Sequence, residues 1–173
     1  TDASIYQMMP HGVVVPESFE DVEATLAFAR AEGMAILPRG GGTSQCGQTV
    51  NHALVIDTSR HLNRILELDV AGRRCLVEPG IVLDELNRQL KPHGLWFPVD
   101  VSTSSRATIG GMAGNNSCGG RSIRYGMMRD NVTAIDAILS DGSQARFGDL
   151  DTTAATGLLA DLQPRLLEMG AAH

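Results

Sequence analysis

The sequence predicts an α+β domain, and three observations lead to that class. The chain begins with a strand, a helix and a second strand, the pattern of a parallel β-α-β unit. Two later segments, residues 64–78 and 137–147, alternate apolar and polar residues around a turn, as antiparallel hairpins do. Parallel and antiparallel pairing in one short chain favours α+β over a doubly wound sheet.

The first strand and helix have clear local signals. Val13–Val15 is a β-branched run, which indicates a strand. Ser18 followed by Asp21 predicts a capping box, because the two side chains can each bond the other residue's backbone amide. We expect this helix to run to Ala31 and to end at Gly33.

A first glycine-rich segment, residues 38–48, follows the apolar run 35–38 and precedes the apolar run 53–57, which both predict strands. Its sequence is Pro-Arg-Gly-Gly-Gly-Thr-Ser-Gln-Cys-Gly-Gln. Glycine lets backbone amides come close to an anion, and consecutive free amides form a concave nest for phosphate oxygens. The segment is therefore a candidate phosphate-binding loop between two strands.

The rest of the chain supplies two hairpins and two helices. The hairpins turn at residues 70–73 and at Asp141-Gly142, a dipeptide favoured in tight turns. Apolar residues at helical spacing predict a helix over 82–90, which starts after Pro79-Gly80 and stops before Gly94. From Thr152 onward the sequence is rich in alanine and leucine, and we expect a helix that connects to a further part of a longer protein.

A second glycine-rich segment covers residues 109–120, and we expect it to be a loop like the first. Its sequence is Ile-Gly-Gly-Met-Ala-Gly-Asn-Asn-Ser-Cys-Gly-Gly. Two such segments in one domain predict two sides of one binding site. A site with two such sides suggests a large phosphorylated cofactor.

Composition excludes several classes of protein. The 173 residues are 43% hydrophobic and 20% charged, which is typical of one globular domain. A net charge of −6 argues against a nucleic-acid partner, because proteins that bind nucleic acids normally have a basic surface. No apolar run approaches the roughly 20 residues of a membrane span, and the N-terminus has no signal pattern, so we expect a soluble intracellular domain. Three widely spaced cysteines favour neither a disulfide framework nor a four-ligand metal site.

The common nucleotide motifs do not fit. Gly42 and Gly47 have the spacing of a nucleoside-triphosphate loop, but Gln48 stands where the phosphate-binding lysine belongs. No stretch supplies G-x-G-x-x-G between a strand and a helix, so the dinucleotide Rossmann fold has no support either.

Taken in order, five groups of residues resemble one family. They are Pro38 to Ser44, Val77-Glu78-Pro79-Gly80, Phe97 to Asp100, Thr108 to Gly111 with Asn116 to Gly120, and Arg124-Tyr125-Gly126. Together they resemble the FAD-binding domain of the vanillyl-alcohol-oxidase type flavoproteins. Within that superfamily the similarity points to the glycolate oxidase and D-lactate or D-2-hydroxyglutarate dehydrogenase branch, and it covers about residues 10–147.

The resemblance implies an architecture. In this family two small α/β subdomains hold FAD between them, so we expect an FAD-binding domain over 1–150 that divides near 57–62. Residues 151–173 would then be a helical linker toward a C-terminal cap domain that lies outside this chain.

The resemblance also implies cofactor-binding residues. Those expected around the pyrophosphate are Pro38, Arg39, Gly40, Gly41, Gly42, Thr43, Ser44 and Gln48. Those expected along the ribityl chain and flavin ring are Pro98, Ser105, Thr108, Gly110 and Gly111. Asn116, Gly119 and Tyr125 would complete that side, and Val132, at the start of a strand, would face the adenosine.

Each of these roles has a plain alternative. Arg39 could be a solvated surface arginine, because a nest can bind phosphate through amides alone. Asn116 could be a turn residue that tolerates left-handed geometry. Tyr125 and the sole tryptophan, Trp96, are more often core anchors than flavin-stacking residues. No histidine occurs from Pro38 to Asn51, so we expect FAD to be bound noncovalently.

The implied activity is oxidation of a 2-hydroxy acid to the 2-oxo acid, as in lactate, glycolate or 2-hydroxyglutarate. That chemistry needs a base for the hydroxyl proton and cationic or metal groups for the carboxylate, and this chain shows no such set, so we expect no catalytic residue and no metal ligand in it. The cap domain would hold the substrate, and a quinone, an iron-sulfur domain or another carrier would accept the electrons.

Two alternatives remain open from the sequence. The chain could be a stand-alone flavin- or nucleotide-binding module without turnover, or the same fold could serve another alcohol or an aldehyde. We expect a cytoplasmic protein, with peripheral attachment to the inner membrane through the electron acceptor as the alternative location.

Overall fold

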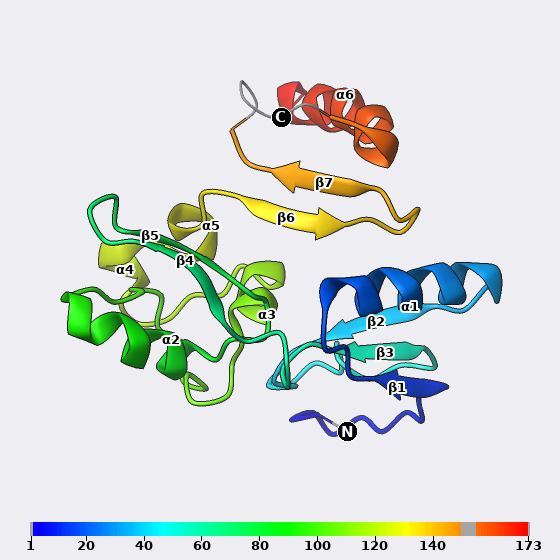
Figure 1. The fold of residues 1–173 in the computed structure, drawn as a ribbon, viewed down its shortest axis with the longest axis horizontal. Helices are drawn as coiled ribbons and strands as arrows, with labels where there is room; N and C mark the ends of the chain where they lie inside the picture. Colours follow the sequence, from blue (N-terminus) through cyan, green and yellow to red (C-terminus); the bar gives the residue numbers. More distant parts are fainter. Residues whose placement is uncertain (1, 150–154, 173) are drawn as a thin grey trace.

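The computed structural model describes residues 2–149 and 155–172. Its first part is a parallel sheet covered by one helix (Figure 1). The elements are β1 (Gly12–Val14), α1 (Phe19–Ala31), β2 (Ile36–Arg39) and β3 (Leu54–Asp57), with strand order β1-β3-β2. The central strand β3 is parallel to both neighbours and is buried along Leu54, Val55 and Ile56. The predicted β-α-β start is confirmed.

Helix α1 begins as the sequence predicts. The amide of Asp21 donates to Ser18 Oγ at 3.2 Å, and the amide of Ser18 donates to Asp21 Oδ2 at 3.1 Å. This reciprocal pair satisfies amides that the first turn of a helix leaves free. Leu26 and Ala29 on the inner face are buried against the sheet, so the capping box and the apolar face together fix α1.

The second part is built on an apolar core between a hairpin and short helices. Its elements are β4 (Ile65–Asp69) antiparallel to β5 (Arg74–Val77), α2 (Leu83–Leu90) with the 3-10 turn η1 (Lys91–His93), α3 (Ile109–Gly114), α4 (Ser122–Tyr125) and α5 (Met128–Asn131). The helix predicted over 82–90 and the first hairpin are confirmed. The buried core residues are Ile81, Leu83, Leu86, Leu90, Val99, Ala107, Ile109, Met112 and Met128.

A second hairpin and the last helix complete the described residues, at the top of Figure 1. Strands β6 (Ile135–Ile138) and β7 (Gln144–Phe147) are antiparallel, as predicted, and α6 spans Gly157–Ala171. The amide of Leu158 donates to Asp141 Oδ2 at 3.2 Å, which ties α6 to the turn of the hairpin. The start of the predicted last helix, at Thr152, lies outside the described residues.

Two expectations from the sequence are wrong in detail. The second glycine-rich segment is not loop throughout, because Ile109–Gly114 forms α3 with Thr108 as its N-cap. Ile109 and Met112 are buried in the core on one face of that helix, and this packing outweighs the low helix propensity of its glycines. Val132 does not start a strand: it ends α5, packs against the core, and β6 begins only at Ile135.

No helix among the described residues is long and apolar enough to cross a membrane.

Candidate functional site

Most backbone amides of the first glycine-rich segment, from Gly40 onward, have no hydrogen-bond partner among the described residues. Strand β2 delivers the chain into this segment at Arg39, whose carbonyl accepts a hydrogen bond from the amide of Thr58 at 3.0 Å. From Gly40 to Gln48, by contrast, no backbone amide donates a hydrogen bond to any residue that the structure describes. Buried backbone donors are almost always paired, but the residues of this run are half-buried or exposed, so their free amides are available to a ligand or to water.

The segment lies directly against the residues that precede α3. A Cβ added to Gly40 would collide with Thr108 Oγ1, and one added to Gly41 would collide with the carbonyl oxygen of Arg106. The first glycine-rich segment is therefore brought together with Thr108, a second predicted site residue, just before the second segment. Thr108 is only 2% exposed, so the first segment packs against a buried side chain at Gly40.

Arg39 places a positive charge on the same segment. Gly42 has a left-handed φ of +63°, and its open side faces the Arg39 guanidinium, which a Cβ at that position would strike. Among residues 2–149 and 155–172, no carboxylate forms an ion pair with Arg39. An unpaired guanidinium beside free amides is suited to bind a phosphate group.

The second glycine-rich segment uses its amides internally. The amide of Gly110 donates to the carbonyl of Pro79 at 2.8 Å, that of Gly111 to Thr108 Oγ1 at 3.4 Å, and that of Gly119 to Ser122 Oγ at 3.0 Å. A Cβ on Gly110 would lie 2.6 Å from Pro79 Cβ, so glycine is required there for close packing. Among the described residues, the first segment has a continuous run of free amides, as expected of a phosphate site, whereas in the second segment only the amides of Cys118 and Gly120 donate no hydrogen bond.

A turn at Pro79-Gly80 connects the two parts of the fold. The amide of Gly80 donates to the carbonyl of Leu62 at 2.7 Å, while Pro79 holds the start of α3. The preceding residue, Glu78, has a fully buried side chain that forms an ion pair with Arg64 at 2.8 Å. The hydrogen bonds from Arg64 lower the pKa of Glu78 below its ordinary value, so the carboxylate stays charged inside the fold.

Trp96 and Tyr125 form an exposed edge-to-face pair. Their ring centroids are 5.2 Å apart with an interplanar angle of 86°. The guanidinium of Arg121 lies 5.5 Å from the Trp96 ring centroid, and that of Arg124 lies 5.3 Å from the Tyr125 ring centroid. Trp96 is 44% exposed and Tyr125 is 37% exposed, so neither ring is the core anchor that the sequence allowed.

The other predicted residues are distributed around this arrangement. Asn116 has a left-handed φ of 46° and accepts a hydrogen bond from the amide of Arg129 at 3.1 Å, which is the turn geometry that the alternative allowed, while its contact with FAD stays a prediction. Ser105 and Gln48 are exposed, and Pro98, Thr43 and Ser44 are half-buried.

Sequence reasoning assigned no role to three supporting residues, of which Asp100 and Glu78 lie in the groups that resemble the family and Asp2 does not. Asp100 accepts a hydrogen bond from the amide of Arg121 at 3.0 Å and lies against Gly119. Glu78 has no local signal except its place before Pro79-Gly80. Asp2 bonds Thr49, just after the first glycine-rich segment, at 2.7 Å, and a contact across 47 residues leaves no pattern in the sequence.

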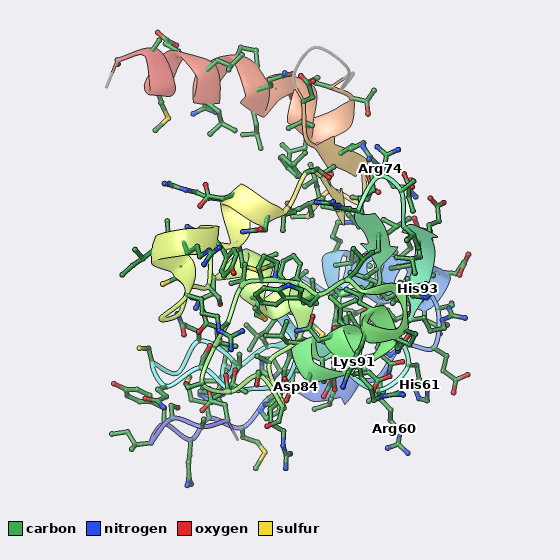
Figure 2. All side chains as sticks on the ribbon, turned by 90° about the vertical axis from the view of Figure 1, so that its left-hand side faces the viewer. Arg60, His61, Arg74, Asp84, Lys91 and His93 are labelled. Carbon is green, nitrogen blue, oxygen red and sulfur yellow. The ribbon has the colours of Figure 1, made fainter. Side chains whose placement is uncertain are left out.

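Other candidate sites lie elsewhere. A hollow of about 660 Å³ beside β1 and α1, and one of about 510 Å³ beside Arg64 and α2, are lined by no residue of either glycine-rich segment. Figure 2 shows Arg60, His61, Lys91 and His93 pointing outward, and all four are exposed. Within the described residues, no group of three or more His, Cys, Asp or Glu side chains could hold a metal ion.

Comparisons with known proteins agree with this geometry. D-2-hydroxyglutarate dehydrogenase from Haemophilus influenzae is 39% identical over 91% of this chain, and glycolate oxidase subunit GlcD from Bacillus subtilis is 34% identical over 83%. The chain spans only 15% and 31% of the lengths of those two relatives. A solved structure of alkyldihydroxyacetonephosphate synthase superposes with a TM-score of 0.70 at 25% identity, over 81% of this chain and 28% of that one.

A family described as FAD binding domain matches residues 10–148. This range includes both glycine-rich segments, the Pro79-Gly80 turn and both hairpins. The chain therefore belongs to the FAD-binding domain family.

Proposed function

We propose that this chain holds FAD noncovalently and is the FAD-binding part of an oxidoreductase that converts a 2-hydroxy acid to the 2-oxo acid. The observation that carries the binding proposal is the run of free amides from Gly40 to Gln48. A diphosphate offers oxygens that accept from such amides, and the Arg39 guanidinium adds a charge of the required sign.

The same geometry supports a second side of the site. Gly111, Ser105 and Tyr125 are exposed on the part of the chain that contacts the first glycine-rich segment through Arg106 and Thr108. We assign the ribityl chain and flavin ring to this side. Thr108 and Gly110 support it by packing within the protein rather than by direct contact.

The proposal includes the domain limits and the mode of attachment. We take 1–150 as the FAD-binding domain, divided near 57–62, and 151–173 as a linker. Residues Pro38 to Asn51 include no histidine, and His52, which follows, has Nδ1 3.0 Å from the carbonyl oxygen of Met9. This arrangement supports noncovalent binding.

The proposed reaction divides its tasks between this chain and the rest of the protein. When bound, FAD supplies the acceptor for the two electrons that leave the alcohol carbon. The residues of this chain bind and orient the cofactor. We propose that a base for the hydroxyl proton and groups for the substrate carboxylate come from a cap outside this chain, and that a quinone, an iron-sulfur domain or another carrier receives the electrons in the cytoplasm.

The substrate class rests on the relatives. Two of them are named for D-2-hydroxyglutarate and glycolate, which are both 2-hydroxy acids. Because the chain spans a small part of their length, the substrate remains a proposal for the whole protein.

Binding is tested by titration of FAD into the 173-residue chain with Trp96, its sole tryptophan, as the reporter. A flavin bound beside Trp96 accepts its excitation energy, so we expect FAD to quench the emission. FAD should also stay with the protein through gel filtration and come off unmodified on denaturation. ADP should compete with FAD, whereas riboflavin, which lacks phosphates, should not.

The contrary result is equally clear. If FAD neither quenches the tryptophan emission nor stays bound, both for the 173-residue chain and for the full-length gene product, the binding proposal is wrong.

The substrate is tested separately. The full-length holoprotein is mixed without air with D-2-hydroxyglutarate, glycolate, an aryl alcohol and an aldehyde. Bleaching of the flavin by a 2-hydroxy acid supports the proposal. Bleaching only by the alcohol or aldehyde overturns the substrate and leaves FAD binding intact.

A further inference from the structure

The N-terminal strap, residues 2–9, lies along the first glycine-rich segment. The amide of Ala3 donates to the carbonyl of Gly42 at 3.0 Å. The hydroxyl of Thr49 donates to Asp2 Oδ2 at 2.7 Å. These two bonds hold the middle of the segment and the residue that follows its end.

Further contacts extend the strap along the same stretch of chain. A Cβ on Gly47 would lie 2.7 Å from Tyr6 Cδ2, so the Tyr6 ring covers this glycine. Beyond the segment, His52 Nδ1 lies 3.0 Å from the carbonyl oxygen of Met9. The strap therefore follows the segment from Gly42 to its exit, on contacts that are independent of one another.

Both oxygens of the Asp2 carboxylate are engaged. Oδ1 accepts from the amide of Ser4 at 2.9 Å and from its hydroxyl, and Oδ2 accepts from Thr49. The hydroxyls of Ser4 and then Thr49 lower the pKa of Asp2 to about 2, so it is ionised at any ordinary pH. Asp2 thus links Ser4 within the strap to Thr49, the residue that follows the first glycine-rich segment.

The segment needs anchors of this kind. Its amides from Gly40 to Gln48 donate no hydrogen bond to any part of the chain that the structure describes, so its own backbone does not hold it in one conformation. Ordering a free segment when a ligand binds costs conformational entropy, so ordering it beforehand improves affinity. At its entrance, Arg106 and Thr108 supply contacts; from Gly42 onward, the strap supplies them.

We propose that Asp2 is a positioning residue for FAD: through Thr49, and with the Ala3–Gly42 bond, it holds the first glycine-rich segment in the conformation that receives the diphosphate. This inference rests on the proposed function. Asp2 does not touch the cofactor in this scheme, and its effect passes through the Asp2–Thr49 hydrogen bond.

The test is a double-mutant cycle on FAD affinity, read from Trp96 emission in the form of the protein that binds FAD. The variants are Asp2→Ala, Thr49→Val and the double variant, with Thr49→Ser as the conservative rescue. Because a hydrogen bond to a charged group is lost in each, we expect each single variant to bind FAD about tenfold more weakly. The double variant should bind no more than about twofold more weakly than the worse single one, since both remove the same bond. Thr49→Ser keeps a hydroxyl and should bind like wild type.

Asp69→Ala is the matched control. Asp69 is also a well-bonded aspartate, held by the amide of Gly72 and by Arg74 at the β4–β5 turn, and its pKa is also lowered, first by the Gly72 amide. Its removal should leave FAD affinity unchanged. A purely structural role for Asp2 would lower stability without the coupling to Thr49.

The outcomes separate the two proposals. Wild type that does not bind FAD overturns the proposed function and this inference with it. Wild-type affinity in folded Asp2→Ala and Thr49→Val overturns the inference alone, and so does a double variant about a hundredfold weaker, because independent effects would then add. If Asp2→Ala fails to fold, Thr49→Val and Thr49→Ser still decide: equal FAD affinity in that pair overturns the inference.

Discussion

Arg64 is bound to Glu78 by both its side chain and its backbone. Its Nη2 donates to Glu78 Oε1 at 2.8 Å, and its Nε and backbone amide donate to Oε2 at 3.2 and 2.8 Å. The Glu78 side chain is completely buried, whereas that of Arg64 is 67% exposed. Because Glu78 precedes the turn that holds Gly110, this ion pair stabilises one side of the candidate site.

We expect Arg64→Ala to lower the free energy of unfolding near neutral pH, because it leaves the buried Glu78 carboxylate without its cation, although the exposure of Arg64 limits the loss. In wild type, the folded pKa of Glu78 lies below the ordinary value of 4.5. The stability that this shift contributes is therefore complete above 4.5 and is lost as the pH falls through the folded pKa. Urea unfolding from neutral to acid pH should show the gap between wild type and variant closing below 4.5.

The control for this prediction is Arg88→Ala. Arg88 forms an exposed ion pair with Glu85, and removal of such a pair costs less free energy of unfolding than removal of the partner of a buried carboxylate. Equal losses in the two variants, or a gap that stays constant in acid, would contradict the role given to Glu78.

Gly41→Ala should weaken FAD binding by at least about tenfold. The added Cβ would collide with the carbonyl oxygen of Arg106, so the first glycine-rich segment must move away from its support. Gly114→Ala is the matched control, because nothing lies within 4 Å of the added atom and alanine favours α3 by about 0.5–1 kcal/mol. Dissociation constants of both variants give the test, and equal affinities would show that the segment is misassigned.

The local parts of this fold could be predicted from the sequence, and the parts set by distant contacts could not. Ser18 and Asp21 form the predicted capping box because both partners lie within one turn. Helix α3 was missed because its glycines disfavour a helix, and the burial of Ile109 and Met112 that stabilises it is a tertiary effect. For the candidate site, the run of glycines after Pro38 was sufficient to predict where the structure has free backbone amides. Nothing local could show that Asp2 contacts Thr49, or that Gly110 serves packing.

Arg39→Gln should reduce FAD affinity about tenfold and make the remaining affinity less sensitive to salt. Arg39 forms no ion pair with any carboxylate in the described part of the chain, and its guanidinium lies against Gly42. An attraction between this cation and a diphosphate is screened as ionic strength rises, whereas bonds from neutral amides are not. Titrations at two salt concentrations measure both effects.

Arg74→Gln supplies the comparison. Arg74 is paired with Asp69 at the β4–β5 turn, at the upper right of Figure 2. FAD affinity should be unchanged in this variant, with the wild-type dependence on salt. If Arg39→Gln behaves in the same way, Arg39 is the solvated surface arginine that the sequence left as an alternative.

The three cysteines should separate in their reactivity, and FAD should change only two of them. Cys46 and Cys118 are exposed, one in each glycine-rich segment, while Cys75 is half-buried and burial raises the pKa of its thiol. The thiolate is the form that attacks a thiol reagent, so Cys75, which is half-buried and has a raised pKa, should react slowest. Bound FAD should slow Cys46 and Cys118 if it lies between the two segments. The Cys46→Ser and Cys118→Ser variants identify which phase belongs to which thiol. If FAD slows the reaction of Cys46 alone, the assignment of the phosphate site stands. The assignment of the flavin ring to the second glycine-rich segment would then be wrong, because a ring bound elsewhere leaves Cys118 accessible to the reagent.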